Sequence, residues 1–229
     1  MSGATLAVVT FLWGREGSVY GPEQVHALQR MVAAHLSIDH RFVCITDDPT
    51  GIECDTLRMW PDGEPSASVG YANGVQRLRL FDPIAAEWLG TDWVLWIDLD
   101  CLIVDDVTPL VTWDDLRMNR AFGRLYNGSL ALHRLGSFPH VWRQLPADRD
   151  AYAGDDYKDD AWIERMVPGA PTWGEEHGIY KIAKSRRSSP VPDDARVLFF
   201  SGGHKPWGDG AAWIHEDIVE RYRRWMEPA

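Results

Sequence analysis

The chain is poor in cysteine and in positive charge, and it has no long apolar run. It contains 3 Cys in 229 residues, and no two of them form a Cys-x-x-Cys pair. Free, partly buried thiols in a reducing compartment are therefore expected. Lys and Arg number 23 against 34 Asp and Glu, a formal net charge of −11. This acidity counts against nucleic acid and against anionic lipid as partners.

We find no targeting signal and no membrane-spanning run in the sequence. The N-terminal stretch 1–14 has no basic region and no small-residue cleavage site, so it is interpreted as a core strand and a cytoplasmic location is expected. The longest apolar stretch, 93–104, is interrupted by Asp98 and Asp100 and is too short to cross a bilayer. The chain has no internal repeat and no linker, and one domain over 1–229 is expected. Tryptophan alone is abundant, with 12 residues.

The first hundred residues alternate between strand and helix patterns. The apolar runs predict strands at 5–12, 41–46, 54–59 and 93–97. A helix is predicted to open at Pro22, and a second one, at 73–89, to bend or break near Pro83. This alternation predicts an α/β fold, with a mostly parallel central sheet and helices on both faces.

The second half of the chain is less regular. Its strands are predicted at 121–125, 129–133 and 197–200, and its helices at 159–166 and 212–226. The two halves are expected to share one sheet, because no linker separates them.

Two carboxylates follow the strongest predicted strand, 93–97. Asp98 and Asp100 lie at its carboxyl end, where open α/β sheets bind ligands. Their spacing predicts that both side chains point to one face. Neighbouring carboxylates repel each other unless a cation neutralises them, and Mg²⁺ or Mn²⁺ prefers oxygen ligands. The pair predicts a metal–diphosphate site; the alternative is a strand-end turn in which both Asp cap backbone amides.

A glycine turn follows the last predicted strand, 197–200. It contains Gly202 and Gly203, then His204, Lys205, Pro206 and Trp207. Glycine lets backbone N–H groups approach a phosphate closely, and a lysine adds positive charge. The pattern predicts that Gly202, Gly203 and Lys205 contact a diphosphate, and a simple turn is the alternative.

Together these motifs resemble those of the glycogenin-like and bacterial lipopolysaccharide galactosyltransferase group of glycosyltransferases, over most of the chain. The resemblance implies a single GT-A-type, Rossmann-like domain. Its nucleotide- and metal-binding half would span about 1–104, and its acceptor half and closing diphosphate-binding turn about 105–229. It also implies a retaining transfer of a sugar from a nucleotide-diphosphate donor, first of all a UDP-sugar, with Mn²⁺ or Mg²⁺ as cofactor. The acceptor would be a hydroxyl of a glycan or a small molecule.

The resemblance also assigns roles to residues outside the two motifs. It places Thr10 and Trp13 at the nucleoside base and Arg77 at the donor sugar and phosphate. It places Asn127 in the sugar pocket. It places Asp159 and Asp160 beside the donor, as catalytic residues together with Asn127.

Two positions depart from the pattern of this group. Phe199 stands where the group has a metal-binding His, so His204 is the candidate third ligand, with water and phosphate oxygens as the alternative. Asp160 stands where the group usually has Gln, and it is interpreted as a base or as a stabiliser of the oxocarbenium-like sugar. Three tryptophans in predicted loops are candidates for stacking on sugar rings: Trp60, Trp173 and Trp207.

Two other functions remain open from the sequence. A non-enzymatic nucleotide-sugar-binding module would bind the donor and release no nucleoside diphosphate. A haloacid-dehalogenase-like phosphatase would use Asp98 as its nucleophile, although in that family the motif normally lies near the N-terminus. The sequence indicates neither the sugar, nor the acceptor, nor the oligomeric state.

Overall fold

A computed structural model describes residues 5–13, 18–58, 76–120, 125–145, 158–183, 188–200 and 205–227. They form a seven-stranded sheet in the order β3-β2-β1-β4-β7-β6-β8 and a three-stranded sheet in the order β5-β10-β9. The first sheet comprises β1 (Leu6–Leu12), β2 (His40–Thr46), β3 (Asp55–Leu57), β4 (Trp93–Ile97), β6 (Leu116–Asn119), β7 (Asn127–Arg134) and β8 (Thr172–Trp173). The second comprises β5 (Cys101–Ile103), β9 (Ile179–Ile182) and β10 (Val197–Phe200).

The helices are short apart from the first and the last. The α-helices are α1 (Pro22–His35), α3 (Ala85–Leu89), α4 (Pro139–Arg143), α5 (Asp159–Met166) and α6 (Glu216–Met226). The 3₁₀ helices are η2 (Arg77–Phe81), η3 (Thr108–Leu110), η6 (Glu175–His177) and η7 (Gly208–Trp213). Within the described ranges, no helix is both long and apolar enough to cross a membrane.

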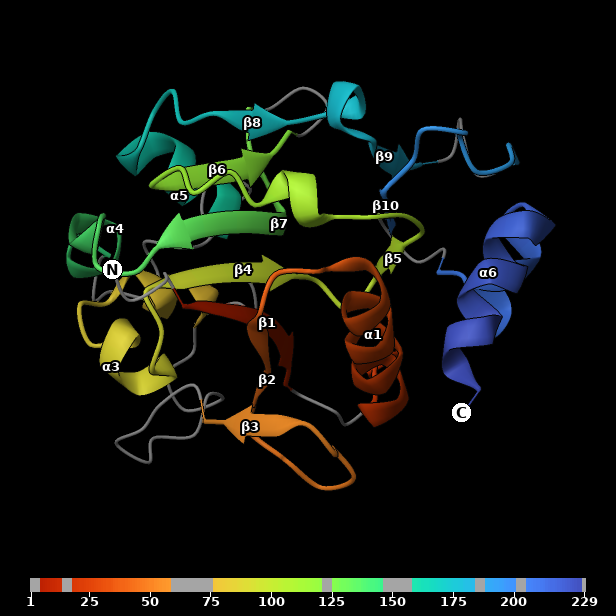
Figure 1. The fold of residues 1–229 in the computed structure, drawn as a ribbon, viewed down its shortest axis with the longest axis horizontal. Helices are drawn as coiled ribbons and strands as arrows, with labels where there is room; N and C mark the ends of the chain where they lie inside the picture. The colour runs from red at the N-terminus through yellow and green to blue at the C-terminus, as the bar shows by residue number, and fades with distance from the viewer. Residues whose placement is uncertain are drawn as a thin grey trace.

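The centre of the large sheet is made of buried, continuously apolar strands. All seven residues of β1 are buried, and β1 pairs in parallel with β2 on one side and with β4 on the other. β7 then runs antiparallel to β4, and Figure 1 shows β1, β4 and β7 side by side across the middle of the molecule. A strand that is buried on both faces takes apolar residues at nearly every position, which explains the long apolar runs in this sequence; Thr10 is the polar residue of β1.

Alternate residues of β1 face two separate cores. Leu6, Val8 and Leu12 belong to a core that also holds residues of α1, α6 and the small sheet. Ala7, Val9 and Phe11 belong to the opposite core, which holds residues of η2, α3, α4 and α5. Figure 1 shows α1 and α6 at the right of the view and α3 and α4 at the left. The α/β class and the helices on both faces are therefore confirmed.

Most of the elements predicted in the first half are confirmed. The predicted strand 93–97 is β4, 5–12 is β1 without its first residue, and 41–46 is β2 with His40 added. Of the strand predicted at 54–59, the described residues form β3, while Met59 lies outside them. The predicted helix 73–89 is broken as expected: Pro83 lies between η2 and α3, while 73–75 lie outside the described residues. Further along the chain, 159–166 is α5 and 197–200 is β10.

The second half departs from the expectations in an unpredicted strand and in the start of the last helix. Of the strand predicted at 121–125, residues 121–124 lie outside the described residues. The structure adds a strand that was not predicted, β6 at Leu116–Asn119, which pairs with β7. It was missed because the two acids before it resemble a loop, although Leu116 and Met118 are buried. The last helix begins at Glu216 rather than 212, after the 3₁₀ segment η7. The two halves do share the large sheet, because β1 to β4 come from the first half and β6 to β8 from the second; β5, β9 and β10 form an additional small sheet.

Candidate functional site

The two acids of the Asp-x-Asp motif lie in the connection between the two sheets. β4 ends at Ile97, and Asp98 to Asp100 lead directly into β5. The Asp98 N–H donates to the Ser129 carbonyl of β7 at 2.9 Å, and the Cys101 N–H donates to the Asp98 carbonyl at 3.0 Å. The carboxyl-end position is confirmed. The two side chains sit on a turn rather than on one continuous strand, however, and each binds its own cation.

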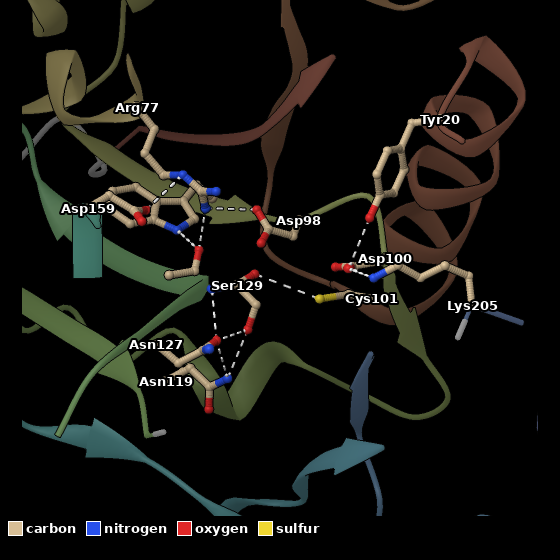
Figure 2. A network of polar contacts seen from close by, with 12 residues as sticks. Tyr20, Arg77, Asp98, Asp100, Cys101, Asn119, Asn127, Ser129, Asp159 and Lys205 are labelled. Carbon is tan, nitrogen blue, oxygen red and sulfur yellow. Dashed lines mark hydrogen bonds and ion pairs between the residues drawn. The ribbon is translucent and has the colours of Figure 1, made fainter. Parts of the chain in front are cut away.

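Asp98 is one of two carboxylates that hold Arg77 of η2. Arg77 Nη1 lies 2.8 Å from Asp98 Oδ1, and Arg77 Nε lies 2.9 Å from Asp159 Oδ2 of α5. The side chains of Arg77 and Asp159 are only 12% and 10% exposed, so the guanidinium bridges two carboxylates that have largely left water. Figure 2 shows Arg77 between Asp159 and Asp98.

Burial changes the proton affinity of this triad. It raises the pKa of Asp98 to about 7. The positive charge of Arg77 lowers this pKa, whereas the negative charges of Asp100 and Asp159 raise it further. Burial also raises the pKa of Asp159 against the effect of Arg77. Burial alone would lower the pKa of Arg77, but the carboxylates of Asp159 and Asp98 raise it above its ordinary value. The guanidinium therefore keeps its charge, whereas Asp98 titrates near neutrality.

Asp100 turns to a different set of partners. Its Oδ2 pairs with the ammonium of Lys205 and accepts a hydrogen bond from the Tyr20 hydroxyl at 3.1 Å. Lys205 Nζ also donates to the Phe200 carbonyl at 3.2 Å. Burial, followed by the charge of Asp100, raises the pKa of Tyr20, so this hydroxyl keeps its proton and stays a donor. Figure 2 shows Tyr20 and Lys205 meeting at Asp100.

The first residues of β7 complete the site from a third direction. The Gly128 carbonyl accepts from Arg77 Nη1 and from the indole N–H of Trp96, the latter at 2.9 Å. A Cβ at position 128 would lie 2.6 Å from Asp159 Oδ2 and 3.4 Å from Arg77 Nη1. Glycine is thus required here by the close approach of a side chain. Asn127, half-buried beside it, engages Asn119 and Ser129.

The two residues expected at the nucleoside base differ in accessibility. Trp13 is partly exposed, and its ring centroid lies 5.0 Å from that of Phe11, whose ring faces the Arg77 guanidinium at 5.7 Å. The Phe11 ring therefore lies between Trp13 and Arg77. Thr10 is fully buried, and its hydroxyl has no hydrogen-bond partner among the described residues. Its side chain is inaccessible to a base in this structure.

The remaining predicted residues are partly placed. Asp160 is half-buried and follows Asp159 in the first turn of α5. Gly202, Gly203, His204 and Trp60 lie outside the described residues. Within the described part of the chain, no group of three or more His, Cys, Asp or Glu side chains is arranged to hold a metal ion.

The structure describes two of the three tryptophans that were candidates for stacking on sugar rings, and it excludes one of them. Trp173 lies in β8 rather than in a loop, and it is completely buried in the core. Trp207 is half-buried, stacks on Tyr222 at 4.9 Å between ring centroids, and donates to the Val19 carbonyl at 3.0 Å. It ties the last part of the chain to the segment before α1.

Sequence reasoning missed three residues at the site. Tyr20 precedes α1 and carries no motif of its own, so its contact with Asp100 has no local signal. Ser129 stands two residues after Asn127, a spacing typical of an Asn side chain that bonds the backbone two residues on. Asn119 is a buried polar residue at the end of β6, and it was not recognised because the sequence pattern predicted no strand at 116–119.

Comparison with known proteins identifies the fold. No protein-family model and no curated protein matches the sequence. Solved structures match over nearly the whole chain. Galactosyltransferase LgtC, in complex with donor and acceptor sugar analogs, is 16% identical, with a TM-score of 0.60 over 97% of this chain and 97% of that one. The Streptococcus pneumoniae TIGR4 glycosyltransferase GlyE is 12% identical, with a TM-score of 0.59 over 96% of this chain and 64% of that one.

A second LgtC structure, an active-site mutant in which Glu replaces Gln, is 17% identical, with a TM-score of 0.57 over 95% of each chain. At these identities the comparisons establish the architecture. The chain has the GT-A-type fold of glycosyltransferases.

Proposed function

We propose that this chain is a metal-dependent, retaining glycosyltransferase that moves a sugar from a nucleotide-diphosphate donor, first of all a UDP-sugar, to an acceptor hydroxyl. The observation that carries the proposal is the polar cluster at the carboxyl end of β4. There Asp98, Asp100 and Asp159 meet Arg77 and Lys205. On a glycosyltransferase fold, this edge of the sheet is where a ligand is expected. The neighbour in complex with donor and acceptor sugar analogs, LgtC, supports the proposal.

The chemistry of the cluster fits a divalent cation. When all three carboxylates are ionised they face two cations, Arg77 and Lys205, and one negative charge is left uncompensated. Asp98 and Asp100 offer carboxylate oxygens, the ligands that Mg²⁺ and Mn²⁺ prefer. These two residues would hold the metal, and phosphate oxygens, water or His204 would complete its shell. When bound, the metal supplies positive charge that stabilises the departing nucleoside diphosphate.

The protein side chains have separate tasks in this proposal. Lys205 exchanges Asp100 for a phosphate oxygen and stabilises charge on the leaving group. Arg77 is held by Asp98, Asp159 and Gly128, so its guanidinium is oriented before the donor arrives. Asn127 and Asp159 line the sugar side. Asp160 is the side chain proposed as a base or as a stabiliser of positive charge on the sugar carbon.

Two alternatives are distinguished by what the protein releases. A nucleotide-sugar-binding module would bind the donor without turnover. A phosphatase would form a phosphoaspartate at Asp98, but Arg77 already holds one oxygen of this carboxylate at 2.8 Å. The structural likeness to glycosyltransferases is a separate reason to favour sugar transfer over both alternatives.

The test is a donor-hydrolysis panel with Mn²⁺ that measures the release of UDP, GDP, CDP and dTDP from their sugar conjugates. We expect one nucleoside diphosphate to be released, and release to stop in excess chelator. Asp98→Ala and Asp100→Ala should each lower turnover by at least about a hundredfold, because each removes a carboxylate that faces the metal and its diphosphate. NMR of the first product of transfer tests retention of the anomeric configuration.

A matched control is Asp105→Ala, which removes an exposed carboxylate five residues further on. It should leave turnover unchanged. Full activity of Asp98→Ala, or full activity in chelator, would contradict the metal assignment. Binding of a donor without any release would establish the binding module instead.

A further inference from the structure

The polar side chains at the junction of β6 and β7 form a closed hydrogen-bond network. The register of these strands shifts between Met118 and Asn119, so that Asn119 lies opposite Asn127. Asn119 Nδ2 donates to Asn127 Oδ1 at 3.3 Å and to Ser129 Oγ at 3.0 Å. The Ser129 hydroxyl in turn contacts Asn127 Oδ1. Irregular pairing of this kind often lies beside active sites, and Figure 2 shows the three residues next to the Asp98 cluster.

One backbone group determines the orientation of the Asn127 amide. The Ser129 N–H donates to the Asn127 side chain at 3.0 Å. A backbone N–H can only donate, so the atom that it meets must be the carbonyl oxygen of Asn127 and not its nitrogen. The amide of Asn127 is therefore not free to flip.

The rest of the network follows from this orientation. Asn119 also faces Asn127 Oδ1, which can only accept, so Asn119 must present its NH₂ group there. The Ser129 hydroxyl, which faces the same oxygen, gives its hydrogen to Asn127 and accepts from Asn119. Asn119 is 1% exposed, so water does not replace these bonds. All three donors converge on one oxygen.

Asn127 is left with one unused group. Its Nδ2 carries two N–H bonds and has no hydrogen-bond partner among the described residues, while its oxygen is saturated. The next residue, Gly128, binds Arg77 through its carbonyl. The unused donors therefore belong to a residue adjacent to the charged cluster.

We infer that Asn119 and Ser129 are positioning residues that lock the Asn127 side chain, so that Asn127 acts toward a bound ligand only as a hydrogen-bond donor. This inference rests on the proposed function, in which Asn127 lines the donor-sugar side. The ligand atom that meets Asn127 is then an acceptor, such as the lone pair of a sugar hydroxyl or ring oxygen. A ligand group that can only donate is rejected there.

The first experiment tests the polarity of the network without any ligand. Asn127→Asp keeps an oxygen that accepts all three bonds, and its urea-unfolding midpoint at pH 7.5 should stay close to that of the wild type. Asn119→Asp places an acceptor against the saturated oxygen, so its midpoint should fall clearly below that of Asn119→Ala. Equal midpoints for Asn119→Asp and the wild type, or an equal loss in both Asp variants, would overturn the inference.

The second experiment tests positioning through Asn127. Calorimetry with Mn²⁺ compares the affinity for UDP-galactose with that for UDP, and the ratio of the two reports the sugar contacts. Asn119→Ala should lower this ratio by up to about tenfold, the worth of a neutral hydrogen bond. It should have no further effect in an Asn127→Ala background, because it acts through that residue.

The control is Thr91→Ala, which removes a buried hydrogen bond to the Trp93 carbonyl at the start of β4. It should leave the ratio unchanged. A ratio unaffected by Asn119→Ala, or additive effects in the double variant, would overturn the positioning role. If the wild type binds neither UDP nor UDP-galactose, the proposed donor is wrong, and the unfolding experiment alone decides the polarity of the network.

Discussion

Arg77 is the residue on which the charged site depends most. It touches two carboxylates and one carbonyl from three different segments, the turn after β4, α5 and β7, and both carboxylates are largely buried. A guanidinium presents several donors in a rigid plane, so it can serve all three at once. An ammonium is a single point charge and can serve only part of this set.

Replacing Arg77 with Lys should therefore destabilise the protein, although the charge is kept. At least one buried carboxylate loses its partner, and we expect a loss of about 3 kcal/mol in the free energy of unfolding. The matched control is Arg41→Lys, because the side chains of the Arg41–Asp55 pair are 42% and 57% exposed. This change should lower the free energy of unfolding by less than about 1 kcal/mol. Urea unfolding of both variants measures the difference, and equal losses would argue against a buried triad.

Gly128 is the second residue at which a small change should matter. In Gly128→Ala the new methyl group would meet Asp159 Oδ2 at 2.6 Å, so Asp159 must move away from Arg77. We expect lower donor turnover together with a lower unfolding midpoint. Gly136→Ala is the control: its φ of +82° makes a side chain strained, but nothing lies within 4 Å. Gly136→Ala should lower the free energy of unfolding by about 1 kcal/mol and leave donor turnover unchanged.

At the scale of elements, β7 joins the site to the core beneath η2. His133 is completely buried in β7, stacked on Phe81 at 4.3 Å and edge-on to Trp96 at 5.9 Å. Its Nε2 faces the Leu80 carbonyl at 3.1 Å. Burial lowers the pKa of His133 to about 4. The packing of η2 on β7 therefore requires a neutral imidazole.

This packing predicts a pH-dependent stability. In the unfolded chain a His titrates near 6.5, so between pH 6.5 and 4 the unfolded state binds more protons than the native state. Stability is thus lost as the pH falls through this window. Lowering the pH from 7 to 5 should reduce the free energy of unfolding of the wild type by about 2 kcal/mol more than that of His133→Gln, because glutamine has no group to protonate. Urea unfolding of both proteins at the two pH values measures this difference. Parallel pH profiles would show that His133 is protonated, or water-exposed, in the native state.

At the scale of the whole molecule, the site is assembled from distant parts of an acidic chain. Asp100 and Lys205 are 105 residues apart in sequence, and Asp98 and Arg77 are 21 apart. The net charge of −11 attracts divalent cations and repels a free nucleotide. Metal and nucleotide are therefore expected to bind together.

We expect Mn²⁺ to bind weakly alone and at least about tenfold more tightly with a nucleoside diphosphate present. Two carboxylates are an incomplete shell, and the phosphates supply the missing oxygens. Because the coupling is reciprocal, Mn²⁺ should strengthen nucleotide binding by the same factor. Titration calorimetry in both orders measures the two factors. Tight Mn²⁺ binding without nucleotide would reveal a further protein ligand, for which His204 is the candidate from the sequence.

The sequence alone determined the elements that are defined by local patterns. Unbroken apolar runs predicted β1, β2, β4 and β10, because a strand buried on both faces tolerates little else. Pro22 marked the start of α1. The position of the Asp pair after β4 followed from the same logic, because a carboxylate ends an apolar run.

The tertiary structure alone decided which side chains meet. The contacts of Arg77 with Asp159 and Gly128, of Tyr20 with Asp100, and of Asn119 with Asn127 join segments whose separation has no periodic signal. The irregular pairing of β6 with β7 and the division into two sheets depend on how strands pack over a shared core. Hydrogen bonds act over about 3 Å in space, whatever the distance along the chain. Local patterns therefore predict elements, whereas the polar network of the site exists only once those elements have packed.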